Sequence, residues 1–272
     1  MNSSIVVEDL HFAYNKGEEV LKGISLVFDR RSTAIIGQNG AGKTTFAKLL
    51  KGLLKPDSGS ISIKGIDTKN TTAAGLSRHI GLIFQNPNDQ IFKSNVLDEV
   101  MFGPLNIMKE EKRARDLALG ALEKVGLVNE LEQNPYDLTL SQRKLIAIAS
   151  VLAMDTEIVI FDEPTIAQDH RGKEMIKGII RELVGMGKLV LTIMHDMDFV
   201  AETFERTIVF SQGQVALDGS TREVFTQEEL LKKAGLERPH VTRLGAKLGC
   251  SHTFLTAEEF VSFAKKSDHR GG

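Results

Sequence analysis

Short apolar runs, bounded by polar or turn-forming residues, recur along the first and last parts of the chain. Four of them are almost continuously apolar, which is typical of strands buried on both faces of a parallel sheet. These runs are residues 33–36, 80–84, 158–161 and 189–194. Shorter runs at 5–8, 24–28, 61–63, 207–210 and 214–217 predict further strands, with a hairpin near Asn15-Lys16-Gly17. The pattern predicts an α/β fold.

Between about residue 88 and residue 154 the apolar spacing becomes that of helices, and no strand pattern interrupts it. We expect a first helix at 95–102, ended by Gly103-Pro104, because glycine and proline together usually stop a helix. A second is expected at 109–125, and a third at 142–153 with an apolar inner face. We therefore predict a helical subdomain inserted into the α/β core.

One glycine-rich segment stands between a predicted strand and a predicted helix. It matches G-x-x-x-x-G-K-[ST] at every fixed position and reads Gly37-Gln38-Asn39-Gly40-Ala41-Gly42-Lys43-Thr44-Thr45. The helix that follows has an apolar face at Phe46, Leu49, Leu50 and Leu53.

The chemistry of this segment suits a polyphosphate. Glycines let the backbone wrap the phosphates, and backbone N–H groups and the helix dipole attract the negative charge. Lys43 would reach the β- and γ-phosphates, and the hydroxyl of Thr44 would bind Mg²⁺. The segment therefore predicts a nucleoside-triphosphate site.

Two adjacent carboxylates, Asp162 and Glu163, follow the apolar run 158–161. Burying two neighbouring acids is unfavourable unless a cation lies nearby, and Mg²⁺ removes the difficulty. We expect Asp162 to bind the metal, directly or through water, and Glu163 to polarise the attacking water.

Three further residues are candidates by position. Gln85 follows the strand at 80–84, so it is a metal or water contact or an ordinary loop glutamine. His195 follows the strand at 189–194; a single histidine is usually structural, but this sheet edge favours contact with the γ-phosphate. Tyr14 precedes the first hairpin, where an aromatic ring stacks on a nucleotide base or caps the sheet.

Composition narrows the class of protein. With 34 basic and 36 acidic residues the net charge is −2, so we expect no nucleic-acid partner. A single cysteine, Cys250, excludes an internal disulfide framework. Residues 1–4 lack the start of a secretory signal, and the longest apolar run, 145–154, is too short to span a bilayer. We expect a cytosolic chain whose membrane role, if any, comes through a partner.

These motifs, in this order and spacing, resemble the ATP-binding-cassette (ABC) ATPases over residues 5–225. The resemblance implies a P-loop NTPase fold with a mixed-sheet core, an antiparallel β subdomain and the inserted helical subdomain, binding ATP and Mg²⁺. It favours adenine stacking by Tyr14. It makes Gln85 a metal contact and the sensor between nucleotide and membrane partner, and it makes His195 the γ-phosphate switch. Asp169 would belong to the loop that crosses between protomers.

A narrower resemblance is carried by residues 83–92 and 102–106, which look like the ATPases of energy-coupling-factor (ECF) transporters, importers of vitamins and transition-metal ions. Residues 234–239 and 241–244 look like the C-terminal extension of that group, which helps two ATPase subunits dimerise. This implies a cassette at 1–225, with its helical subdomain at about 88–154, and an extension at 226–272. It also implies a peripheral subunit on the cytoplasmic face of the membrane. The expected partners are a second ATPase, a transmembrane coupling protein and a substrate-binding membrane subunit.

One motif departs from the family. The signature Leu-Ser-Gly-Gly-Gln is expected 24 residues before Asp162, where the chain reads Leu138-Thr139-Leu140-Ser141-Gln142. Thr139 keeps a hydroxyl, but Leu140 and Ser141 replace both glycines. A leucine side chain obstructs the close approach to phosphate that glycine allows. Sliding the motif onto Leu140-Ser141 would place Arg143-Lys144 in the glycine positions and break the helix spacing, so we prefer the first register.

In this family the signature of one subunit closes over the ATP held by the other. We therefore expect a different partner ATPase with an intact signature, so that this chain's ATP is hydrolysed and the partner's turns over poorly. The alternative is that the altered signature is tolerated and both sites work.

Other functions are another type of ABC importer or a soluble ATP-gated clamp on nucleic acid or the ribosome. The clamp is disfavoured because the sequence has neither a long coiled-coil insertion nor a second cassette. A regulatory subunit that hardly hydrolyses ATP is disfavoured by the intact Glu163 and His195.

Overall fold

The computed structural model describes the backbone of residues 5–268 and the side chains of residues 5–266. The prediction that residues 1–4 carry no secretory signal lies outside the described residues, as do the last four residues of the predicted extension. Within residues 5–268, none of the helices combines the length and the apolar character needed to cross a bilayer.

A six-stranded sheet forms the centre of the fold, in the order β10-β9-β3-β8-β7-β6. Its strands are β3 (Thr33–Ile36), β6 (Ile80–Ile83), β7 (Ile158–Asp162), β8 (Leu189–Ile193), β9 (Arg206–Ser211) and β10 (Gln214–Ser220). Only β10 is antiparallel to its neighbour, so the carboxyl ends of the other five strands meet at one edge. Apolar residues on both faces explain the nearly continuous apolar runs, because each face packs against its own core.

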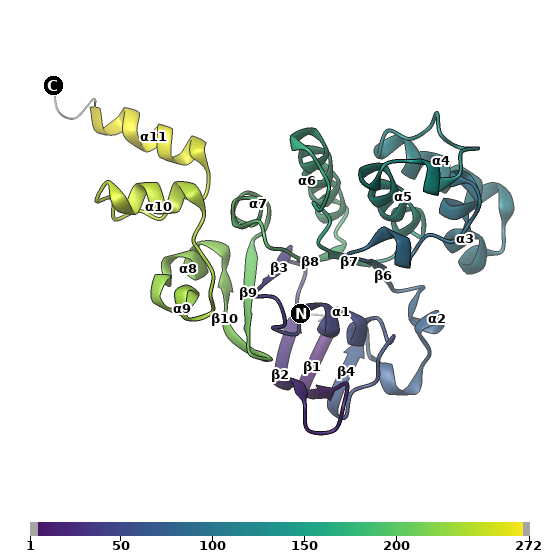
Figure 1. Cartoon of the computed structure of the whole chain (residues 1–272), viewed down its shortest axis with the longest axis horizontal. Coiled ribbons are helices and arrows are strands. Elements are labelled where there is room, and N and C mark those ends of the chain that lie inside the picture. Colours follow the sequence, from purple (N-terminus) through teal and green to yellow (C-terminus); the bar gives the residue numbers. More distant parts are fainter. Residues whose placement is uncertain (1–4, 269–272) are drawn as a thin grey trace.

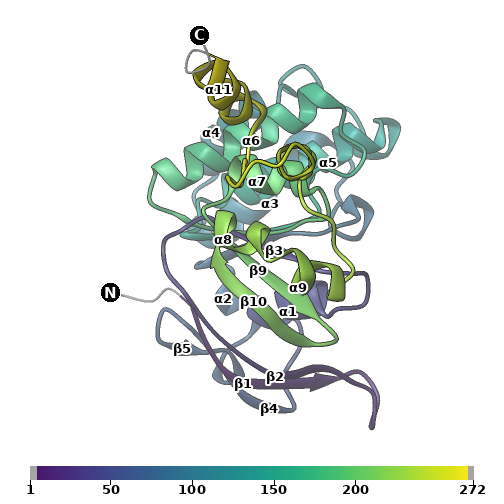
Figure 2. The ribbon, with the colours of Figure 1, turned by 90° about the vertical axis from the view of Figure 1, so that its left-hand side faces the viewer.

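A second sheet is antiparallel, in the order β2-β1-β4-β5. Its strands are β1 (Ile5–Ala13), β2 (Glu19–Phe28), β4 (Ser58–Ile63) and β5 (Ile66–Asp67). Helix α1 (Lys43–Leu50) lies between this sheet and the central sheet (Figures 1 and 2). The ring of Phe46 in α1 lies 6.2 Å from that of Phe28 and 5.3 Å from that of Phe210. One buried phenylalanine thus joins the two sheets.

The predicted length of α1 is wrong by one turn. Leu53 was expected on its apolar face, but the helix ends at Leu50 and Leu53 is exposed. Gly52 follows the helix with φ = 73°, a left-handed conformation that stops an α-helix, so the chain turns away before Leu53.

The inserted helices are α3 (Val96–Met108), α4 (Glu111–Lys124) and α5 (Leu140–Ala153). Figure 1 shows them together beyond the β6 edge of the sheet. The expected end of the first helix at Gly103-Pro104 is wrong, because α3 continues through both residues to Met108. Pro104 is buried within α3, which packs on α4 and α5, and a Cβ on Gly103 would lie 2.6 Å from Cγ of Met154. Tertiary packing therefore overrides the local stop signal.

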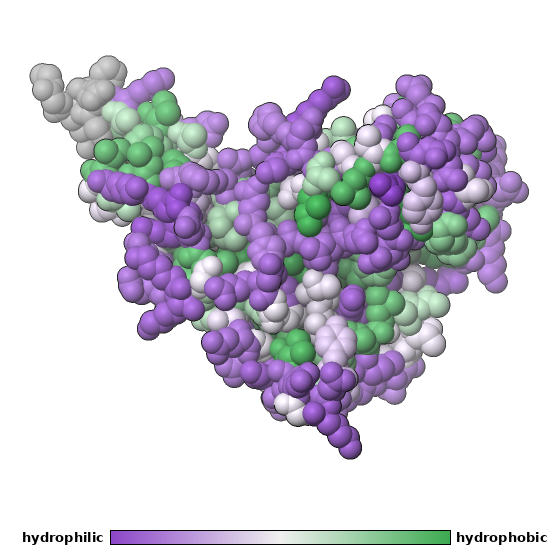
Figure 3. All heavy atoms as spheres, in the orientation of Figure 1, coloured by the Kyte–Doolittle hydropathy of each residue, from purple (hydrophilic) through white to green (hydrophobic). Residues whose placement is uncertain are grey.

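The remaining helices either flank the central sheet or extend the chain. They are α2 (Ala73–Leu76), α6 (His170–Gly185), α7 (Met197–Thr203), α8 (Thr221–Thr226), α9 (Glu228–Lys233), α10 (His240–Lys247) and α11 (Ala257–Asp268), with 3-10 turns at Thr68–Asn70, Pro87–Asp89 and Pro135–Asp137. The core does not stop at residue 225, because Leu231, Ala234 and Leu236 are buried in it. Beyond them, α10 and α11 project outward, and Figure 3 shows apolar side chains gathered there.

Candidate active site

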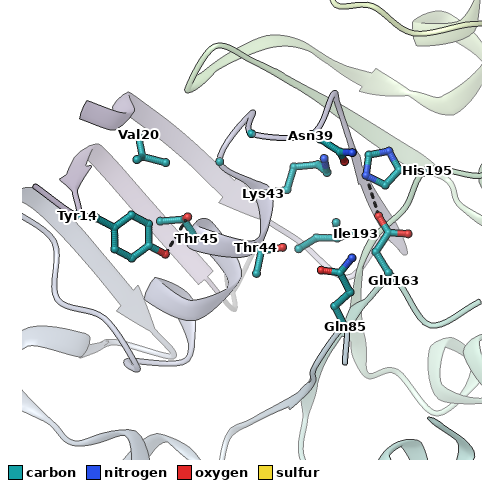
Figure 4. A pocket seen from close by; sticks show the side chains of 12 residues that line it. Tyr14, Val20, Asn39, Lys43, Thr44, Thr45, Gln85, Glu163, Ile193 and His195 are labelled. Carbon is teal, nitrogen blue, oxygen red and sulfur yellow. Dashed lines mark hydrogen bonds and ion pairs between the residues drawn. The ribbon is translucent and has the colours of Figure 1, made fainter. Parts of the chain in front are cut away.

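A cavity of about 500 Å³ opens where α1 begins, beside the carboxyl ends of the central strands. Twelve residues from both sheets, the glycine-rich loop and the strand ends line it: Tyr14, Val20, Asn39, Gly40, Gly42, Lys43, Thr44, Thr45, Gln85, Glu163, Ile193 and His195. Figure 4 shows Tyr14 at one end, Glu163 and His195 at the other, and Lys43 and Thr44 between them. The cavity is therefore long, with an aromatic end and an ionisable end.

The glycine-rich loop holds Lys43 in place. The Lys43 Nζ atom donates hydrogen bonds to the backbone oxygens of Gly37 and Gln38, at 2.8 and 2.9 Å. Burial lowers the pKa of this ammonium group, and the charges of Glu163 and Asp162 act in the opposite direction. Gly42 precedes α1, and no side chain caps that end of the helix. The first N–H groups of α1 are therefore available to an anion.

Two glycines of this loop are required by its packing. A Cβ on Gly37 would lie 2.3 Å from the backbone oxygen of Phe210, and one on Gly42 would lie 2.5 Å from Cδ2 of Leu21. Gly42 also has φ = 98°, in the left-handed region. Besides the predicted role in phosphate binding, these glycines let the loop pack closely on β9 and β2.

Three residues of the predicted loop do not line the cavity, namely Gly37, Gln38 and Ala41. The Ala41 side chain is buried in the core. The Gln38 side chain lies against the C-terminal part of the chain, since a Cβ on Gly235 would be 1.5 Å from Nε2 of Gln38. Only the backbone of Gln38, through its bond to Lys43, supports the cavity directly.

Asp162 and Glu163 are both buried at the end of β7, with exposed fractions of 2% and 5%. Burial is the main cause that raises the pKa of Asp162, and it raises the pKa of Glu163 to about 7 with help from the charge of Asp162. Glu163 has φ = 49°, and its N–H donates to the backbone oxygen of Ile193 at 3.1 Å. Two carboxyl groups whose burial is unfavourable thus lie next to each other, and the backbone of Glu163 is in a strained conformation. Both features are typical of functional sites.

His195 pairs with one of these acids. Its Nε2 atom lies 3.1 Å from Oε1 of Glu163. Burial and the charge of Lys43 lower the pKa of His195, which favours the neutral imidazole. A carboxyl with a pKa near 7 beside a neutral imidazole is suited to accept or pass a proton at neutral pH.

The three residues predicted to bind Mg²⁺ lie together. Thr44, Gln85 and Asp162 line a smaller cavity of about 190 Å³ next to the main one. The Oδ1 atom of Asp162 is buried without a hydrogen-bond partner, so it has an unmet need for a cation or donor. The described residues hold no cluster of three His, Cys, Asp or Glu side chains suited to a metal. Hydroxyl, amide and carboxylate oxygens with free space for water fit Mg²⁺, which keeps several water ligands.

Tyr14 stands at the aromatic end of the cavity, with 56% of its surface exposed. Its hydroxyl lies 3.2 Å from Oγ1 of Thr45, and its ring packs edge-on against Phe12 at 4.9 Å between centroids. These contacts fix the ring beside the loop while leaving a face open, which suits stacking on a base.

The residues of the altered signature do not line this cavity. Thr139 is the N-cap of α5 and forms a capping box with Gln142. The Ser141 hydroxyl donates to Oε1 of Gln168, and Nε2 of Gln168 donates back to the Ser141 carbonyl, both at 3.1 Å. Leu140 is 40% exposed. The structure of the single chain therefore leaves residues 139–142 away from this cavity.

Asp169, the other residue expected to act between protomers, is also absent from the cavity lining. It caps α6, where its carboxylate accepts a hydrogen bond of 2.8 Å from the N–H of Gly172. In the single chain its visible role is to begin that helix.

Sequence reasoning missed three residues of the site. Val20 and Ile193 line the cavity, but an aliphatic residue in a strand carries no chemical signal. Lys144 lies buried behind the strand ends and donates to the backbone oxygens of Phe84, Gln85 and Asp162. A lone lysine at the start of the apolar stretch 145–149 was the available signal.

Comparison with known proteins gives consistent matches. A family model described as "ABC transporter" matches residues 21–166. A putative ABC transporter ATP-binding protein of Pyrococcus furiosus is 40% identical over 245 residues, which cover 90% of this chain and 94% of that protein. The energy-coupling factor transporter ATP-binding protein EcfA2 of Caldanaerobacter subterraneus is 37% identical over 253 residues, covering 90% and 88%.

A solved structure matches as well. It is cbiO1 from Clostridium perfringens, described as part of the ABC transporter complex cbiONQ, with a TM-score of 0.73 and 32% identity. The match covers 92% of this chain and 100% of that one. The family match at 21–166 contains the glycine-rich loop, Gln85 and both buried acids, whereas His195 lies beyond it.

Proposed function

Since the chain belongs to the ABC transporter family of ATPases, we propose that it is the ATP-hydrolysing subunit of an ECF-type importer for vitamins or transition-metal ions. The resemblance to ABC ATPases, the fold class and the assignment as an ATPase are confirmed by the family match and the relatives. The observation that carries the site assignment is that Lys43, Gln85, Glu163 and His195, far apart in the sequence, line one cavity. The ECF assignment is supported by the similarity to EcfA2 and cbiO1.

The geometry suggests how the residues of the chain divide the work. ATP would lie along the cavity with its base against Tyr14 and its phosphates at Lys43 and the start of α1. Mg²⁺, held by Thr44, Gln85 and Asp162, would neutralise phosphate charge. Glu163 would orient the attacking water and accept its proton, because its pKa of about 7 suits a base at neutral pH. His195 would hold Glu163 in place and face the transferred phosphoryl group.

The proposed partners are a second ATPase subunit, a transmembrane coupling protein and a substrate-binding membrane subunit, with the complex on the cytoplasmic face of the membrane. The extension at 226–272 would contribute to pairing of the ATPases. This role is supported by exposed apolar residues on its last two helices or directly after the first of them, namely Leu244, Leu248, Val261 and Phe263. Purification of the tagged chain from membranes should recover these subunits. Recovery of the chain without any membrane protein would count against the proposal.

We further propose that the two ATP sites of the complex are unequal, because Leu140 and Ser141 stand where the family has glycines. The test is to express this chain with its partner ATPase and change Glu163→Gln in one preparation and the corresponding glutamate of the partner in another. Loss of a general base lowers turnover by roughly 100- to 10,000-fold at the affected site. We expect the change in this chain to remove most of the activity of the complex. Equal losses from the two changes would remove the asymmetry.

A further inference from the structure

Lys144 is a charged residue inside the core, in the second turn of α5, with an exposed fraction of 1%. Its Nζ atom donates to the backbone oxygens of Phe84 at 2.7 Å, Gln85 at 3.0 Å and Asp162 at 3.0 Å. An ammonium group has three N–H donors, so these contacts use its full capacity. All three of these acceptors are backbone oxygens rather than carboxylates. The group is held by backbone oxygens.

The three acceptors lie where the sheet stops holding two strands together. β6 and β7 pair from Ile80 opposite Ile158 to Ile83 opposite Phe161, and the ladder ends there. Phe84 and Gln85 continue β6, and Asp162 continues β7 toward β8. Lys144 bridges the two segments just beyond the last pair. It therefore connects β6 and β7 just beyond their last pair, next to Gln85 and to Asp162, which still pairs with Ile193 of β8.

We infer that Lys144 is a positioning residue for ATP hydrolysis, which fixes Gln85 and the Asp162-Glu163 pair relative to each other and to α5. The inference rests on the proposed ATPase site. Burial lowers the pKa of Lys144 to about 8, against the opposing charges of Asp162 and Glu163. An apolar residue, like its neighbours at 145–149, would avoid that penalty. What an apolar residue lacks is the set of three donors aimed at the strand ends.

The same contacts link two functional regions. The proposed signature, residues 138–142, leads into α5 one turn before Lys144. A second connection comes from Gln90, whose side chain accepts from the N–H of Phe84 at 3.1 Å and donates to the Ala147 carbonyl at 3.0 Å. A displacement of α5 would therefore shift the residues around this chain's own ATP.

The chain contains a matched control. Lys51 is also buried, burial lowers its pKa to about 8, and its Nζ donates to the Ile80 carbonyl at 2.6 Å and to Oγ of Ser77 at 2.8 Å. It thus serves the opposite end of β6, away from the nucleotide cavity. Lys51→Met removes a buried lysine of the same type without touching the strand ends that carry the site.

The experiment compares Lys144→Met, Lys144→Arg and Lys51→Met in the full-length chain within its purified complex. It measures thermal stability, kcat, the KM for ATP and the Mg²⁺ concentration that half-saturates binding of a fluorescent ATP analogue. We expect both methionine variants to lose stability. Only Lys144→Met should lower kcat, by roughly 10- to 100-fold, with the KM for ATP nearly unchanged, because small misplacements at a reacting centre have effects of that size. It should also require more Mg²⁺, and Lys144→Arg should recover part of kcat.

The inference is overturned if Lys144→Met keeps the kcat of the parent, or if Lys51→Met lowers kcat as much. It is also overturned if Lys144→Arg is as impaired as Lys144→Met. If Lys144→Met does not fold, Lys144→Gln, which keeps a donor but not the three-way bridge, is judged by the same outcomes. A parent complex without ATPase activity would count against the proposed function, whereas an active parent with a fully active Lys144 variant counts against this inference alone.

Discussion

The N-termini of α1 and α5 are built in opposite ways. α1 begins after Gly42, and no side chain caps its first N–H groups. α5 begins after Thr139, whose side chain and that of Gln142 cap each other's backbone. A side-chain cap of this kind typically stabilises a helix by about 1 kcal/mol, so α1 gives up stability that α5 keeps.

This difference indicates how well the N-terminus of each helix is suited to bind phosphate. The start of α1 has no side-chain cap, so its free N–H groups suit the binding of an anion. At the start of α5 the capping box satisfies the N–H groups of Thr139 and Gln142, and the Ser141–Gln168 pair connects it to the loop before α6. This is the physical basis of the proposed asymmetry, because a self-capped, leucine-bearing end has less to offer the phosphates of a partner's ATP.

The largest effect, on ATP turnover, is expected at the uncapped N-terminus of α1. Lys43→Ala removes the cation of the phosphate loop and should lower ATP turnover by about 100- to 1,000-fold. Steady-state ATPase assays of the complex measure it, with Lys51→Met at the far end of the same helix as control. Turnover near that of the parent would refute the site assignment.

The next effect is a change with pH in the free energy of unfolding, caused by the buried carboxyl of Glu163. The pKa of Glu163 is raised to about 7 from 4.5, so stability is lost as the pH rises from 4.5 through 7. Above that range the penalty is about 3 kcal/mol, and Glu163→Gln should remove much of it. Without nucleotide, urea unfolding at pH 8 should show a more stable variant, and at pH 4 the two proteins should converge. Equal stabilities at pH 8 would contradict the raised pKa.

A smaller effect, on the free energy of unfolding, is expected at the capped N-terminus of α5. Thr139→Ala removes one half of the capping box and should lower the free energy of unfolding by about 1 kcal/mol. Because Thr139 lies outside the chain's own cavity, binding of ATP to the isolated chain should be unaffected. Isothermal titration with ATP and urea unfolding measure the two quantities, and weaker ATP binding would break the contrast between the two helix ends.

The smallest effect tests the asymmetry itself. Leu140→Gly combined with Ser141→Gly opens the start of α5, and turnover of the complex should rise by at most roughly twofold as the partner's ATP site begins to work. The partner's glutamate variant, which silences that second site, is the control. An unchanged rate would mean that the altered signature already works.

Most of the candidate site could be predicted from short sequence motifs. The phosphate loop, the acid pair after β7 and the polar residues ending β6 and β8 are each short patterns, and parallel strands bring them to one sheet edge. The predictions were wrong or incomplete where contacts with distant parts of the chain determine the local conformation. Pro104 stays helical because of its neighbours, Gln38 turns away from the cavity, and Lys144 acts on strands 18 to 60 residues away.

The contact between Gln38 and Gly235 has a practical consequence. Gln38, a residue of the phosphate loop, lies against a segment almost two hundred positions later, beyond the stretch that carries the family motifs. A version of the chain trimmed to those motifs would lose Leu231 and Leu236, which would expose to solvent this side of the loop and the core residues that they cover. ATPase rates measured on such a fragment would not represent the whole chain, so biochemical work should keep the C-terminal extension.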